Sequence, residues 1–191
     1  MANWASTSYI IEGPEETLKK IDEAIKQSIN NPPENTSEGW EGSILMTLGA
    51  DKEDLDKFYV RGFVEESTIN SPNEMQLYAE EAWGITDFYK ILGKLLPDIK
   101  IYWIVESIED EVFATNDKEG KHFNGRYIAD AYIGNADYYE YFETEDSLYE
   151  WISKITNGKV NTPEKVEKFN DRAEDKGLDD YIHIFKIEIV D

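Results

Sequence analysis

Apolar residues recur three or four positions apart in five stretches of the chain, which is the spacing that places them on one face of a helix. The clearest stretch lies between Thr86, a typical first residue of a helix, and Pro97, which ends it. Ser43–Leu48 is short and apolar enough to be a strand instead, and this alternative stays open. The predicted helices cover residues 14–29, 40–48, 86–96, 144–157 and 162–176.

Other stretches are rich in β-branched and aromatic residues and are bounded by Gly, Pro, Asn or Ser, as strands are. The strongest is Ile99–Glu106. In the last one, His183 alternates with apolar neighbours, which predicts a hydrogen-bonded core histidine rather than a catalytic one. The predicted strands cover residues 4–12, 59–65, 74–83, 99–106, 111–115, 126–133 and 181–189.

The order of these elements favours an α+β protein in which helices cover an antiparallel sheet. Helices that lie between separated strands are typical of a ferredoxin-like core, because its split βαβ units give this order. The length of 191 residues suits one sizeable hydrophobic core. We therefore predict a single α+β domain over residues 1–191, although two tightly joined halves would also fit.

Charge narrows the classes of partner. The chain has 41 Asp and Glu against 19 Lys and Arg, a formal net charge of −22, and only three of its cations are Arg. Proteins that bind nucleic acid or anionic membranes need clustered Lys and Arg, so neither class of ligand is expected here. A basic protein is the partner that this charge would match.

Cysteine and membrane signals are missing. Without Cys there are no disulfides, no thiolate catalysis and no Cys-ligated metal sites. The longest unbroken apolar run, Ile101–Val105, is far too short to span a membrane, and Met1–Trp4 does not begin like a signal peptide. We expect a cytoplasmic location.

Three stretches together resemble a known family: ANWASTSYIIEG, AEEAWGITDFYKILGKLLPDIKIYW and VFATNDKEGKHFNGRYIAD. The chain is similar to a family of uncharacterised proteins from gut Bacteroidetes, related more distantly to the YubB-like proteins of plasmids and phages. The resemblance implies a ferredoxin-like fold and an origin on mobile elements, and it implies no activity. Relatives often have Cys where this chain has Ala5.

Residues able to carry chemistry are few. His122 follows the turn at Gly120 and is expected to be solvated, and no phosphate loop or serine-hydrolase elbow is present. Glu80 and Glu106 end two predicted strands, where a pair of carboxylates can hold a divalent cation or act as acid and base. Two solvated strand-end acids explain the same residues more simply. We predict no catalytic residue, cofactor or resident metal.

Aromatic and acidic surfaces offer two further hypotheses. Tyr138, Tyr139 and Tyr141 are clustered, and together with Trp83 they suit a protein contact patch. Strand-edge packing explains the tyrosines equally well. Residues 62–89, 101–117 and 127–153 hold six, five and seven acids and no Lys or Arg. On one face they would imitate the phosphates of DNA, whereas scattered acids would only keep the protein soluble.

The function that the sequence favours is a non-enzymatic protein-interaction module, with Trp83, Tyr138, Tyr139, Tyr141, Glu80 and Glu106 as binding candidates. One alternative is a nucleic-acid mimic that inhibits a basic DNA-binding protein or nuclease. The other is a divalent-metal-dependent hydrolase built on Glu80 and Glu106.

Overall fold

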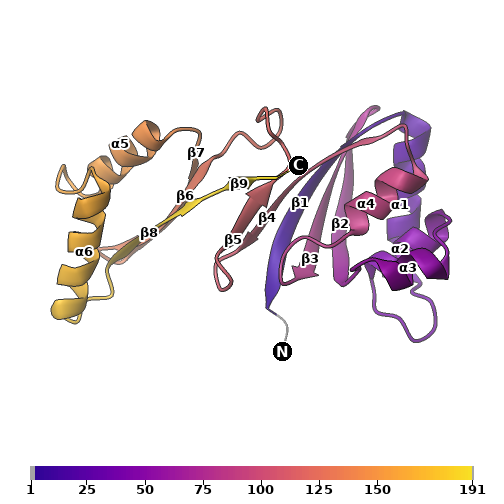
Figure 1. Ribbon diagram of the computed structural model, residues 1–191, viewed down its shortest axis with the longest axis horizontal. Helices are drawn as coiled ribbons and strands as arrows, with labels where there is room; N and C mark the ends of the chain where they lie inside the picture. Colours follow the sequence, from indigo (N-terminus) through magenta and orange to yellow (C-terminus); the bar gives the residue numbers. More distant parts are fainter. Residues whose placement is uncertain (1–2, 191) are drawn as a thin grey trace. The chain divides into compact units, whose positions relative to one another are not determined.

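The computed structural model describes residues 3–190, and its chain divides into two compact units (Figure 1). Unit 1 runs to Asp117, and unit 2 comprises Lys118–Val190. Met1, Ala2 and Asp191, which belong to the predicted domain, lie outside the described residues. The protein is mixed α+β, and whether its two units act as the one domain predicted over residues 1–191 stays a prediction.

Unit 1 consists of one antiparallel sheet and four helices on one of its faces (Figure 1). Its strands lie in the order β2-β3-β1-β4-β5, so the first strand is central. In chain order the elements are β1 (Trp4–Glu12), α1 (Glu15–Asn30), α2 (Glu41–Leu48), α3 (Lys52–Lys57), β2 (Gly62–Ser71), β3 (Glu74–Ala82), α4 (Phe88–Leu95), β4 (Lys100–Ser107) and β5 (Val112–Thr115).

The alternation of β1 fixes which face of this sheet is covered. Thr7, Tyr9 and Ile11 are buried beneath the helices, and the Tyr9 ring meets Phe88 of α4 edge-on at a centroid distance of 5.9 Å. Ser6, between them in sequence, points to the opposite, open face. Ser43–Leu48, for which a strand was the alternative, lies within helix α2.

Unit 2 is a smaller sheet with two helices. Strand β6 is central, and β7 and β8 pair antiparallel on either side of it. Helices α5 and α6 pack on one face, where Ala129, Leu148, Ile152 and Ile182 form the core. The elements are β6 (Tyr127–Ile133), β7 (Ala136–Phe142), α5 (Glu145–Ile155), α6 (Pro163–Asp175), β8 (Tyr181–Lys186) and β9 (Glu188–Ile189).

Two expectations about unit 2 are wrong. The last strand is broken at Ile187 into β8 and β9. His183 is exposed and stacks on Tyr181 at 4.7 Å, so it is not a core histidine. The reason is the register of β8: its even-numbered residues Ile182 and Ile184 face the helices, and its odd-numbered ones face the other side.

Across residues 3–190, the helices are all too short or too polar to cross a membrane.

Candidate functional site

Trp83 lies in unit 1 where β3 ends and is among its most exposed large side chains, with 50% of its surface accessible. Its backbone is in the left-handed region, with φ at 58°. A bulky residue adopts that conformation at a cost of about 1 kcal/mol or more, so such strain marks positions worth testing for function. The strained backbone is tied in place, because the Trp83 amide donates to the Asn3 carbonyl at 2.9 Å.

Glu80 and Glu106 lie in one row across the unit 1 sheet, on its open face. Each is the register partner of Ser6, from the two strands that flank β1. The Ser6 hydroxyl donates to Glu80 at 2.8 Å. With Ser6 between them, the two residues are roughly 10 Å apart along the sheet. The structure therefore places the two predicted carboxylates on the same face of the sheet, on the two strands that flank β1.

The three predicted tyrosines of unit 2 do not share a surface. Tyr138 lies on the helix side of β7, where its ring meets Trp151 edge-on at 5.6 Å. Tyr139 and Tyr141 point to the other side and are 40% and 46% exposed. Their rings contact each other at 5.8 Å. Because Trp83 belongs to the other unit, its surface is described separately from theirs.

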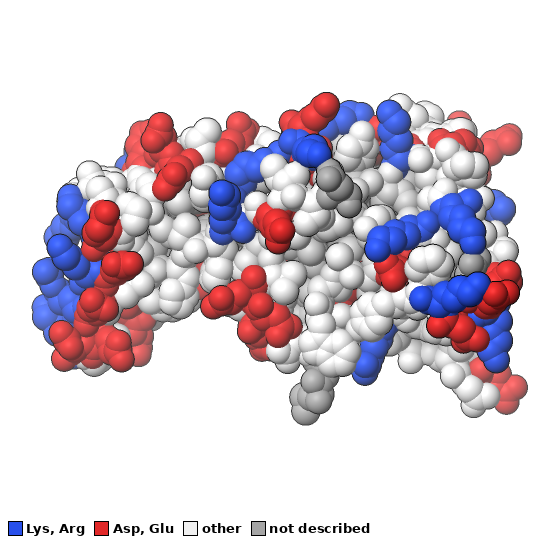
Figure 2. All heavy atoms as spheres, in the orientation of Figure 1, with Lys and Arg blue, Asp and Glu red and all other residues white. Residues whose placement is uncertain are grey.

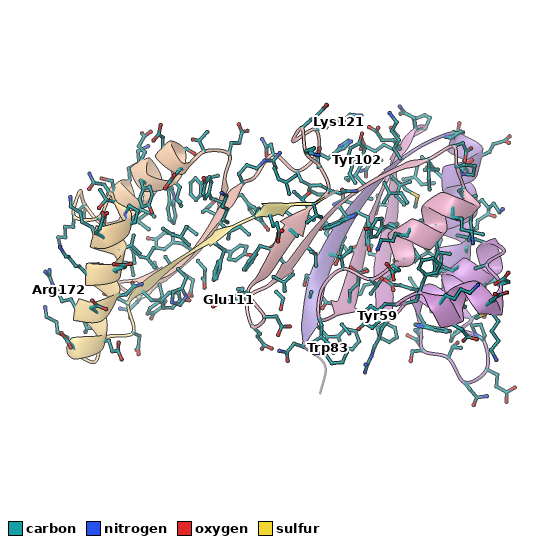
Figure 3. The ribbon with its side chains drawn as sticks, in the orientation of Figure 1. Tyr59, Trp83, Tyr102, Glu111, Lys121 and Arg172 are labelled. Carbon is teal, nitrogen blue, oxygen red and sulfur yellow. The ribbon has the colours of Figure 1, made fainter. Side chains whose placement is uncertain are left out.

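Around Trp83 the structure gathers aromatic residues that the sequence did not single out. We call Trp4, Tyr59, Arg61, Phe63 and Trp83 the aromatic patch. Trp4 and Tyr59 are 43% and 41% exposed, and the Trp4 ring contacts Phe63 at 5.5 Å. Figure 3 shows Tyr59 and Trp83 at the same end of unit 1.

Polar groups hold the aromatic patch together and border it. The Arg61 guanidinium lies over the Trp83 ring at 4.7 Å, a cation–π contact. The Tyr59 hydroxyl donates to the Ala82 carbonyl at 3.1 Å. The turn between β4 and β5 adjoins through Asn3, whose amide donates to Asp110 at 2.7 Å. That turn carries the exposed acids Glu109 and Glu111, so the rim of the patch is acidic.

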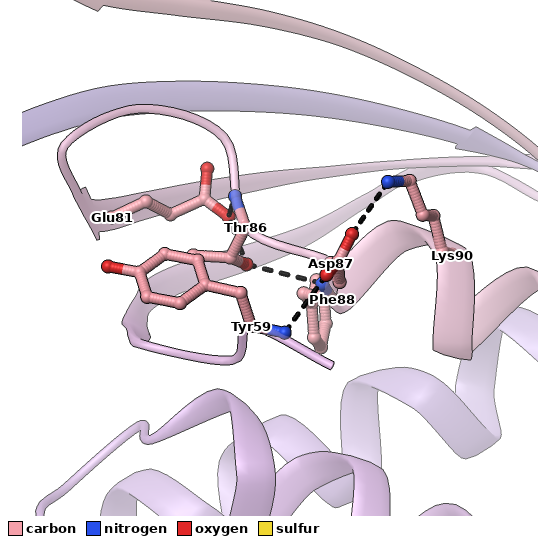
Figure 4. Close-up of polar contacts among 6 residues, drawn as sticks. All are labelled: Tyr59, Glu81, Thr86, Asp87, Phe88 and Lys90. Carbon is pink, nitrogen blue, oxygen red and sulfur yellow. Dashed lines mark hydrogen bonds and ion pairs between the residues drawn. The ribbon is translucent and has the colours of Figure 1, made fainter. Parts of the chain in front are cut away.

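Two buried glutamates lie under the aromatic patch. We call Glu41, at the start of α2, and Glu81, on β3, the carboxyl pair; both are fully buried. Glu81 accepts hydrogen bonds from the hydroxyls of Thr7 and of Tyr9, the latter at 2.8 Å. It also accepts from the Thr86 amide at 3.1 Å, which ties the Trp83–Thr86 loop to the sheet (Figure 4).

Thr86 contacts both members of the carboxyl pair. Its hydroxyl oxygen is 2.8 Å from Glu41 Oε2 and 2.7 Å from Glu81 Oε1. A hydroxyl has one hydrogen, so it donates to one carboxyl, and the other contact is a hydrogen bond only if that carboxyl carries a proton. Burial raises the pKa of Glu41 well above its usual value, and the adjacent charge of Glu81 raises it further. The raised pKa favours Glu41 as the member that holds the proton.

The Trp83–Thr86 loop is also held at the residue that follows it, Asp87. The Asp87 carboxylate accepts from the Tyr59 amide at 2.9 Å and pairs with Lys90 at 2.6 Å (Figure 4). The Asp87 amide donates to the Tyr59 carbonyl at 2.7 Å. The loop that follows Trp83 is thus held at Thr86 by the carboxyl pair and at Asp87 by Tyr59, and we call these hydrogen bonds the loop framework.

The sequence contained a partial signal for this framework. Glu80 and Glu81 are adjacent in a strand, so one of them had to point toward the helices, and the structure shows that it is Glu81. Nothing local marked Glu41, because an acid in the first turn of a helix is ordinary. Its burial depends on Gly62, 21 residues further along the chain.

Comparisons with protein-family models, with curated proteins and with solved structures found no match for this chain.

Proposed function

We propose that the protein is a non-enzymatic interaction module and that the aromatic patch is its contact surface. The observation that carries the proposal is the exposure of Trp4, Tyr59 and Trp83 around Arg61 on one end of unit 1. Trp, Tyr and Arg are the residues most enriched at the energetic centres of protein interfaces. Exposure of a Trp side chain to water is energetically unfavourable, which favours a surface that a partner protein covers.

The partner we propose is a basic protein. Glu109 and Glu111 border the patch, and the whole chain carries a net charge of −22. An acidic rim around an apolar centre speeds the approach of a cationic surface and leaves the aromatic side chains to supply most of the affinity. Tyr139 and Tyr141 offer a second exposed aromatic pair, on unit 2, and serve as the comparison surface.

The test is affinity capture with matched variants. Wild-type protein, the Tyr59→Ala/Trp83→Ala variant and the Tyr139→Ala/Tyr141→Ala variant are immobilised and exposed to the same lysate. We expect basic proteins that bind the wild type and the unit 2 variant, fall at least tenfold on the patch variant, and elute with salt. Thermal melts of each variant show whether the fold is intact. Retention of the same proteins by a folded patch variant would contradict the proposal.

We also propose a ferredoxin-like core for unit 1. The support is the element order β1-α1-α2-α3-β2-β3-α4-β4 with the strand order β2-β3-β1-β4; with α2 and α3 as an insertion after α1, this is the arrangement of split βαβ units. An experimental structure with α1 and α4 on opposite faces of the sheet would contradict it. A cytoplasmic location and an origin on mobile elements stay predictions from the sequence.

The two alternative functions also stay predictions. For the hydrolase, Mg²⁺ or Mn²⁺ at millimolar concentration should raise the melting temperature of the wild type and not of Glu80→Gln. For the nucleic-acid mimic, the acids should form rows without cations. On the face drawn in Figure 2, red and blue side chains are interspersed, which favours the interaction module over the mimic.

A further inference from the structure

The helical side of unit 2 carries a basic groove in an otherwise acidic protein. We call it the α6 groove; it has a volume of about 360 Å³. Its cations are Lys159, Lys165, Lys168, Arg172 and Lys176. Its floor is apolar, with Phe169, the buried Val160 and Leu178, which is 53% exposed. Arg172 is labelled on α6 in Figure 3, and the blue side chains along α6 are visible in Figure 2.

These cations differ from several lysines on the other helices. Lys19, Lys26, Lys57 and Lys154 each pair with an acid four residues earlier. Within residues 3–190, none of the five cations of the groove has a carboxylate within 4 Å, although α6 itself contains five acids. The one acid that lines the groove, Asp180, accepts a hydrogen bond from the Gly134 amide at 3.0 Å.

Lys165 occupies a position that works against the helix. It is the third residue of α6, where the helix dipole disfavours a cation. Thr162 precedes the helix, and a Glu at position 165 would complete a capping box with it. Thr162 makes no capping hydrogen bond here. The Lys165 ammonium donates to the Asn161 side-chain oxygen at 2.7 Å, which leaves its charge without a carboxylate partner. An anionic ligand in the groove would offset the cost of this charge to the helix.

We propose that the α6 groove binds a small organic phosphate, with the phosphate groups on the cations and an aromatic or aliphatic body on Phe169 and Leu178. Guanidinium and ammonium groups are the usual phosphate ligands of proteins. The volume is that of a small-molecule site, and the floor is apolar as such sites are. A long polyanion is disfavoured, because the net charge of −22 repels it beyond the groove.

Calorimetric titration of the whole chain with pyrophosphate and with ATP tests the proposal. We expect both probes to bind, ATP more tightly because its base adds apolar contact. Lys168→Gln/Arg172→Gln should weaken both by about tenfold or more, since each substitution removes a cation that would bind phosphate. Leu178→Ala should weaken ATP alone, and Lys154→Gln on α5 should change neither.

The same titrations can overturn the proposal. It fails if neither probe binds at millimolar concentration, or if the double variant, shown by circular dichroism to be folded, binds as the wild type does. It fails equally if a DNA duplex binds more tightly than ATP, because the ligand would then be a nucleic acid. Should the double variant not fold, Lys165→Gln/Lys176→Gln replaces it with the same expected loss.

Discussion

Units 1 and 2 carry their charges in different ways, although both are acidic. Residues 1–117 hold 24 acids against nine cations, and four lysines in the helices of unit 1, Lys19, Lys26, Lys57 and Lys90, pair with nearby acids. Residues 118–190 hold 16 acids against ten cations, and five of those cations line one groove without an ion pair. The net charge of each unit therefore does not show how its charges are arranged. Unit 1 exposes aromatic residues next to acids, whereas unit 2 exposes cations around an apolar groove.

The largest effect is expected in unit 1 at Gly62, which packs against the buried carboxyl of Glu41. A Cβ at this position would lie 2.5 Å from Glu41 Oε1, and the carboxyl cannot move away because it is buried. Gly62→Ala should lower the free energy of unfolding by about 3 kcal/mol, measured by urea denaturation.

Gly134→Ala in unit 2 is the matched control, since nothing lies within 4 Å of its added Cβ and only its φ of 58° is unfavourable. It should cost about 1 kcal/mol. Equal losses in the two variants would show that Glu41 is not held against Gly62. Glu41→Ala should recover part of the loss in Gly62→Ala, because it removes the clashing group.

The next effect is a pH dependence specific to the carboxyl pair. The raised pKa of Glu41 means that the folded state keeps a proton that the unfolded chain releases. The stabilisation is complete below the ordinary pKa of Glu and is lost as the pH rises toward the raised value, by about 1.4 kcal/mol per pH unit. Glu41→Gln is always neutral, so it should be more stable than the wild type at pH 7, with the difference closing toward pH 4.

Urea denaturation at both pH values measures this difference. Glu80→Gln, on β3 next to Glu81 but on the open face, is the control that tests whether the effect needs the buried position. A Glu41→Gln variant that is less stable than the wild type at pH 7 would mean that Glu41 is ionised in the folded protein.

The helices and strands of the two units show how much of the fold could be predicted from the sequence. Periodicity placed α1, α2 and α4 and most strands of unit 1, because amphipathic spacing is a local property. The predicted helices did not include α3. It missed strand β7, although Gly134 and Asn135, with φ of 58° and 69°, form the two-residue turn that joins it to β6. A Gly-Asn pair between two apolar stretches is a hairpin signal that was available.

The candidate site was less accessible. Trp83 was identified from its type, but Trp4 and the segment that carries Tyr59 and Arg61 are distant in sequence, and only the sheet brings them to Trp83. The carboxyl pair joins residues 40 positions apart, and its protonation depends on burial, which no local pattern records. The tyrosine cluster was split because adjacent strand residues face opposite sides, so Tyr138 entered the core while Tyr139 stayed exposed.

A smaller effect is expected at Trp83, where the patch and its backbone strain can be separated. Trp83→Gly and Trp83→Ala both remove the indole, but only glycine accepts a φ of 58° without cost. The glycine variant should therefore be more stable than the alanine variant by about 1 kcal/mol, measured by thermal denaturation. Both should lose captured partners equally. If the alanine variant retains its partners, the indole is not the contact.

The smallest effect is expected in unit 2, at Lys165. Lys165→Glu places an acid in the first turn of α6, completes a capping box with Thr162 and removes a like charge three residues from Lys168. The variant should be more stable than the wild type by about 0.5 kcal/mol, while its affinity for pyrophosphate falls. Lys19→Glu on α1, which replaces a lysine already paired with Glu15, should instead be neutral or destabilising. If Lys165→Glu also destabilises the protein, Lys165 supports the fold rather than a ligand, and the contrast between the helices of the two units disappears.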